Sequence, residues 1–118
     1  MSRPMEVLVV EDGWEYIERA RRWLGEGLNF TRAGCGQETL DLLAKQAFDV
    51  LYLDMDFGRI PADQLLGDAA ELTERFHGDP AEAQQILAAN QGVYILSALR
   101  EVGREIPVVF SYDFQPQP

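Results

Sequence analysis

Two short apolar runs, each followed directly by acidic residues, most constrain what this chain can fold into. Residues 5–10 (MEVLVV) precede Glu11 and Asp12, and residues 49–54 (DVLYLD) end at Asp54. Each run is too short for a helix, and both are typical of strands buried on both faces of a parallel sheet. Ligands bind at the carboxyl ends of the strands in open parallel sheets, so we expect these acids to converge there.

The segments around these runs complete an alternation of strands and helices. The spacing of apolar residues predicts helices over residues 14–25, 37–46 and 92–103, and strands over residues 28–33 and 106–111. A β-α-β-α-β order with short connections indicates a parallel sheet with right-handed crossovers.

Residues 57–91 interrupt this alternation and predict an inserted pair of helices. Apolar residues recur at helical spacing over residues 61–76. Asp79 and Pro80 then form a helix-start signal, with Asp79 as the N-cap and Pro80 in the first turn. We expect these helices to provide either extra cover for the core or a surface for a partner.

Length, composition and charge exclude several classes of protein. The chain has 118 residues, of which 47% are hydrophobic, and this suits one domain over residues 1–118 with an extended tail at residues 112–118. One cysteine, Cys35, allows no internal disulfide and fits a cytoplasmic protein. The first residues match neither a signal peptide nor a membrane span. A formal net charge of −10 without a basic cluster argues against nucleic-acid binding and favours basic protein partners or divalent cations.

Clustered carboxylates at the carboxyl edge of a sheet predict a cation site. Neighbouring carboxylates repel one another, and Mg²⁺ relieves this repulsion because it prefers oxygen ligands and needs only one or two carboxylates plus a phosphate. A carboxylate beside Mg²⁺ can accept a phosphoryl group, since carboxylates form acyl phosphates. The alternative is that Glu11 and Asp12 cap the helix that follows them.

The sequence resembles the receiver domain of bacterial response regulators. The similarity runs through EVLVVED and AGCGQETLDLLAKQAFDVLYLD, and it resumes at GVYILSALREVGREIPVVF. The resemblance implies a flavodoxin-like three-layer α/β/α fold whose four-stranded parallel sheet lacks the family's fifth strand and helix. It also implies that Glu11 and Asp12 bind Mg²⁺, that Asp54 is the phosphoacceptor, and that the backbone carbonyl of Asp56 is a further metal ligand.

Three departures separate this chain from the family pattern. Tyr112 stands where the family places Thr or Ser after the fourth strand, and Ser111 comes one residue earlier. The only lysine, Lys45, lies on a predicted helix far from the acids, so the phosphoryl group would lack its usual cation. Asp54 and Gly92 are also 38 positions apart, a spacing longer than the family's, which accounts for the insertion.

These departures leave three functional hypotheses. We favour an atypical signalling or adaptor domain that is not an enzyme and that binds a protein, either a histidine kinase or another signalling protein. A homodimer through an exposed sheet edge or the inserted helices is a further arrangement. The second hypothesis is a genuine Mg²⁺-dependent phosphoacceptor in a two-component phosphorelay. The third follows from LYLDMDFG, which resembles haloacid-dehalogenase-type phosphohydrolases with Asp54 as nucleophile and Asp56 as general acid.

Overall fold

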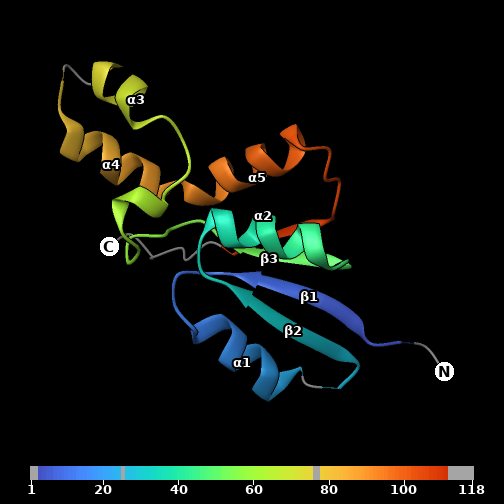
Figure 1. Cartoon of the computed structure of the whole chain (residues 1–118). Coiled ribbons are helices and arrows are strands. Elements are labelled where there is room, and N and C mark those ends of the chain that lie inside the picture. The colour runs from blue at the N-terminus through green and yellow to red at the C-terminus, as the bar shows by residue number, and fades with distance from the viewer. Residues whose placement is uncertain (1–2, 25, 76–77, 112–118) are drawn as a thin grey trace.

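A parallel four-stranded sheet lies at the centre of the computed structural model, which describes residues 3–24, 26–75 and 78–111 (Figure 1). The strands are β1 (Met5–Val10), β2 (Leu28–Ala33), β3 (Val50–Asp54) and β4 (Val108–Ser111), in the order β2-β1-β3-β4. The longer helices are α1 (Glu15–Trp23), α2 (Gly36–Lys45), α4 (Pro80–Ala89) and α5 (Gln91–Glu101), and the short ones are α3 (Ala69–Arg75) and a 3₁₀ turn (Ala62–Gln64). This is the predicted flavodoxin-like α/β/α fold. The predicted tail over residues 112–118 lies outside the described residues.

Strand β1 occupies an inner position because its side chains are apolar on both faces. Its last four residues are all buried, and Val10 lies opposite Ala33 on one side and Leu53 on the other. Strands β1 and β3 therefore end at the same level, and the residues that follow them are neighbours. None of the helices in the described ranges has the length and apolar character that a membrane crossing requires.

The two faces of the sheet are covered unequally, as Figure 1 shows. We call the face under α2 and α5 the two-helix face, and the face under α1 the one-helix face. Alternate strand residues point to the two-helix face and pack with Phe57 and α5 in the larger core cluster. Its buried members are Leu8, Val10, Ala33, Leu43, Leu51, Leu53, Phe57, Ile95 and Leu99. The buried members on the one-helix face are Val7, Val9 and Ile17.

The inserted segment forms two packed helices that project from the sheet, with a small core of their own (Figure 1). The prediction of one helix over residues 61–76 is wrong, because a 3₁₀ turn and an irregular stretch precede α3. The buried amide of Gln91 accepts a hydrogen bond from the backbone N–H of Leu66 at 2.6 Å and donates to its carbonyl at 3.0 Å, so this N–H cannot bond to the preceding turn of a helix. Gly67 follows with a φ of +112°, which is outside the helical range.

The insertion is attached to the end of β3 at two points. The backbone N–H of Phe57 donates to the carbonyl of Ala88 at 2.8 Å, and that of Gly92 donates to the carbonyl of Met55 at 3.1 Å. A side chain at Gly92 would place its Cβ only 2.7 Å from the carbonyl oxygen of Asp54, so glycine is required for this close approach. As predicted, Asp79 caps α4 through bonds from the backbone N–H groups of its first turn.

Candidate functional site

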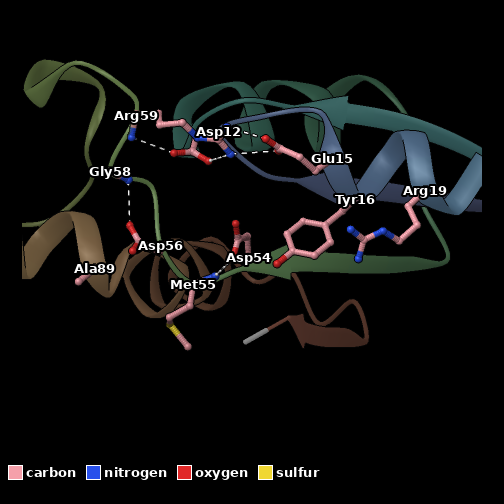
Figure 2. Close-up of a pocket in the computed structure, with 10 residues that line it drawn as sticks. All are labelled: Asp12, Glu15, Tyr16, Arg19, Asp54, Met55, Asp56, Gly58, Arg59 and Ala89. Carbon is pink, nitrogen blue, oxygen red and sulfur yellow. Dashed lines mark hydrogen bonds and ion pairs between the residues drawn. The ribbon is translucent and has the colours of Figure 1, made fainter. Parts of the chain in front are cut away.

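An open pocket of about 880 Å³ lies at the carboxyl edge of the sheet and brings together residues from β3, α1 and the insertion (Figure 2). Its lining consists of Asp12, Glu15, Tyr16, Arg19, Asp54, Met55, Asp56, Gly58, Arg59 and Ala89. Two acids that the sequence places after separate strands, Asp12 and Asp54, therefore share one site. We call it the acidic pocket.

Asp54 is half-buried at the end of β3, and its Oδ1 accepts a hydrogen bond from the backbone N–H of Met55 at 2.8 Å. Burial raises the pKa of its carboxyl to about 6, against the lowering effect of backbone hydrogen bonds from Met55 and Asp56. The negative charges of Asp12 and Asp56 raise this pKa further. Asp54 is thus an ionisable group that the folded chain holds partly out of water.

Asp12 is paired with an arginine of the insertion, as Figure 2 shows. Its Oδ2 accepts from the backbone N–H of Arg59 at 2.9 Å, and its Oδ1 accepts from Nη2 of the same residue at 3.1 Å. The side chain of Asp12 is only 3% exposed, so this arginine is its main partner.

The same guanidinium also holds Glu15 in the first turn of α1. Nη1 of Arg59 donates to Oε1 of Glu15 at 2.6 Å, and Nη2 donates to Oε2 at 3.0 Å. This pairing lowers the pKa of Glu15 to about 2, and the two carboxylates hold the pKa of Arg59 well above its usual range. One cation thus bridges the end of β1 and the start of α1.

Glu11 does not line the acidic pocket, although it directly precedes Asp12. Its side chain is fully buried, and its two oxygens accept from the backbone N–H groups of Tyr16 at 3.2 Å and Ile17 at 2.9 Å. These N–H groups belong to the first turn of α1, which leaves them without helical partners. Glu11 therefore acts as an internal cap for α1, the alternative role that the sequence left open.

The arrangement does not fit the Mg²⁺ site that the resemblance implies. The described residues contain no group of three or more His, Cys, Asp or Glu side chains placed to hold a metal ion. Glu11 bonds to α1, and both oxygens of Asp12 are already bonded to Arg59. The side chain of Asp56 accepts through Oδ1 from the backbone N–H of Gly58 at 2.9 Å, and the role of its backbone carbonyl as a metal ligand stays a prediction.

Two arginines of the pocket were not predicted from the sequence. Arg59 is the first cation after Asp54 in the chain, which was the available signal, but its position in an irregular loop gives no periodic pattern. Arg19 lies on α1, and the helical spacing of that segment indicates only that it is away from the buried Ile17.

Ser111 ends β4, and Tyr112 lies outside the described residues, so the hydroxyl position of the family pattern stays a prediction.

A second, apolar groove of about 510 Å³ lies on the one-helix face. Its lining consists of Met5, Val7, Val9, Tyr16, Arg19, Ala20, Trp23, Leu24, Leu28, Phe30, Val50 and Tyr52. Trp23 is 75% exposed and Leu24 57%, so the end of α1 presents large apolar side chains to solvent. Sequence periodicity identified these residues as helical and did not indicate that the sheet beside them is uncovered.

Comparison with known proteins gives a result for the fold. No protein-family model matches the sequence, and no curated protein matches it. The receiver domain of the Francisella response regulator 1452 superposes with a TM-score of 0.56 at 19% identity, over 90% of this chain and 64% of that one. The D54A mutant of the response regulator MaeR bound to sulfate gives a TM-score of 0.55 at 14% identity, over 92% and 66%.

The chain has the receiver-domain fold. The strand order β2-β1-β3-β4 and the position of Asp54 at the end of β3 are consistent with it. The chain spans just under two thirds of the length of these two solved chains. The receiver fold thus places Asp12 and Asp54 at one edge of the sheet. Arg59 and Ala89, which belong to the insertion, add to the lining of the acidic pocket.

Proposed function

We propose that this chain is a receiver-like signalling domain that acts by binding another protein through the apolar groove of its one-helix face. The observation that carries this proposal is the apolar groove. One helix covers this face of the parallel sheet, and the exposed Trp23 forms part of the groove's lining. Sheets of this kind normally have both faces covered. An apolar surface of this kind beside polar residues marks a site of interaction.

The charges around the groove favour an acidic occupant. Arg19 is the one charged residue in the described lining, and Arg21 and Arg22 line an adjoining hollow together with Trp23, Leu24 and the acid Glu26. In the described part of the chain none of these three arginines forms an ion pair. We therefore propose that the occupant is an amphipathic helix of a partner protein, with acidic residues flanking its apolar face.

Two synthetic peptides test this choice of occupant. Both carry the same apolar helical face, and their flanking residues are glutamate in one and lysine in the other. We expect the glutamate peptide to bind at least tenfold more tightly and to shift the indole NMR signal of Trp23. Non-specific attraction to a chain of net charge −10 would favour the lysine peptide. Tighter binding of the glutamate peptide would therefore point to the arginines beside the groove.

A pair of tryptophan variants provides the matched control. Trp23→Ser removes a groove residue and should abolish binding. Trp14→Ser removes a tryptophan that is also exposed but packs on Arg32, outside the groove, and should leave binding unchanged. Equal binding of both peptides, or no binding of either, would overturn the proposal. A dimer of the free chain that Trp23→Ser dissociates would also overturn it, because the groove would then belong to a second copy.

A second candidate function is that of a phosphoacceptor for a histidine kinase. The position of Asp54, half-exposed at the edge of an open pocket, favours it. Beryllofluoride with Mg²⁺ mimics the phosphorylated state, and a phosphoacceptor would show shifts in the NMR signals around Asp54 that Asp54→Ala removes. We expect no such shifts from the wild-type chain, because Asp12 is engaged by Arg59. We also expect no turnover of p-nitrophenyl phosphate, whereas a phosphohydrolase would hydrolyse it.

A further inference from the structure

We propose that the guanidinium of Arg59 takes the place of a divalent cation at the carboxyl edge of the sheet, and that it ties the insertion to α1. The proposal concerns the acidic pocket and does not depend on what binds the apolar groove. It rests on four hydrogen bonds from Arg59 to two carboxylates that come from different parts of the chain.

The geometry of these bonds explains how one side chain can serve two acids. The planar guanidinium offers a fork of N–H donors, which suits the simultaneous binding of carboxylate oxygens. Nη2 donates to Asp12 and to Glu15, and Nη1 donates to Glu15. The backbone N–H of Arg59 donates to the second oxygen of Asp12. Every carboxylate oxygen of Asp12 and Glu15 thus has a donor from one residue.

The pairing with Arg59 reduces the repulsion among carboxylates that a metal ion would otherwise reduce. Asp12, Asp54 and Asp56 line one pocket, and carboxylates gathered in this way repel one another. A positive charge bonded to Asp12 offsets part of that repulsion without any bound ion. Together, the guanidinium and the backbone N–H of Arg59 also occupy both oxygens of Asp12. An ion would need these oxygens, since Mg²⁺ and Mn²⁺ bind carboxylate, carbonyl and water oxygens.

The position of Arg59 in the chain gives the pairing a second consequence. Arg59 lies two residues after Phe57, which is fully buried and bonds to the end of α4. The first segment of the insertion is therefore held on one side by the core and on the other by α1. Removal of the guanidinium should free Oδ1 of Asp12 and loosen this segment, while the backbone N–H of residue 59 can still donate to Oδ2.

Binding of Mn²⁺ to the full chain, followed by the electron paramagnetic resonance signal of the free ion, tests the proposal. We expect Arg59→Ala to bind Mn²⁺ at least tenfold more tightly than the wild type, and the additional change Asp12→Asn to cancel that gain. The control is Arg75→Ala, which removes the same charge from an ion pair with Glu71 on α3 and should leave Mn²⁺ affinity unchanged. Arg59→Lys keeps the charge and should bind Mn²⁺ less well than Arg59→Ala.

The backbone NMR spectrum supplies a readout for the tie to α1. We expect Arg59→Ala to shift the amide signals of residues 15–17 and 58–60, and Arg75→Ala to leave them in place. Equal Mn²⁺ affinity in the wild type and Arg59→Ala, or a gain that survives Asp12→Asn, would overturn the proposal. Circular dichroism establishes that each variant folds, and Arg59→Gln, which keeps part of the side chain, replaces Arg59→Ala if the alanine variant does not.

Discussion

The two faces of the sheet carry similar apolar side chains but are covered to different extents. On the two-helix face, alternate residues of β1 and β3 are fully buried, and Phe57 and α5 complete a continuous core. On the one-helix face, Val7 and Val9 are buried, but Leu28, Phe30 and Tyr52 line an open apolar groove. The difference lies in the number of helices above each face. Hydrophobicity of a strand therefore predicts that both its sides need cover, and it does not predict what provides that cover.

The largest effect should come from the two-helix face. Leu51→Ala removes a fully buried side chain from a packed core, and we expect it to lower the free energy of unfolding by about 3 kcal/mol. Urea denaturation measures this loss. Val109→Ala on the one-helix face is the matched comparison, and its cost should stay below about 1 kcal/mol because half of that side chain is already in water. Equal costs would break the contrast between the faces.

A smaller effect should come from the cap that holds the single helix of the one-helix face. Glu11→Ala leaves the N–H groups of Tyr16 and Ile17 without their acceptor, and we expect a loss of about 2 kcal/mol. Glu11→Gln, which keeps one oxygen acceptor, should lose less. Thermal unfolding followed by circular dichroism measures both. A negligible cost for Glu11→Ala would mean that α1 is held by its packing on the sheet alone.

A substitution of Asp54, at the edge of the one-helix face, should change the free energy of unfolding in the opposite direction and stabilise the chain. Its pKa is about 6 in the folded chain against an ordinary value of 3.8, so folding favours the protonated form. Its contribution to stability is fully present below pH 3.8 and is lost as the pH rises through 6. We expect Asp54→Asn to stabilise the chain at pH 8 by about 1 kcal/mol, a figure reduced for screening by water at this half-exposed site. The gain should vanish near pH 4 in urea titrations.

The smallest effect on stability should come from Trp23. Three quarters of this side chain is exposed, so Trp23→Ser should change the free energy of unfolding by less than about 0.5 kcal/mol. The same variant should lose the acidic peptide, which would separate the groove's role in binding from any role in folding. A large loss of stability would instead show that Trp23 belongs to the core of the one-helix face.

The strands and most helices could be predicted because their signals are local. The apolar run at residues 5–10 and the capping residue Asp79 each determine structure within one segment. The helix expected over residues 61–76 failed because a distant side chain, that of Gln91, binds the backbone of Leu66. No local pattern records such a contact.

The candidate site was predicted in part for the same reason. The ends of neighbouring parallel strands must meet, so the sequence could bring Asp12 and Asp54 together. The direction of a side chain is a different matter. Glu11 points to the first turn of α1, and Arg59 reaches Asp12 across 47 positions of sequence. Both outcomes depend on loop geometry, which periodicity does not encode.

The order of the strands has a consequence for how the molecule assembles and opens. Strands β1 and β2 are joined through α1 alone, whereas residues 55–107 lie between β3 and β4. Closing the longer connection costs more chain entropy, and contacts between distant segments form later in folding. A chain emerging from the ribosome could thus pair its first three strands while the fourth was still being synthesised. In the finished protein, the backbone amides of β4 should exchange their hydrogens with solvent much sooner than those of the central β1.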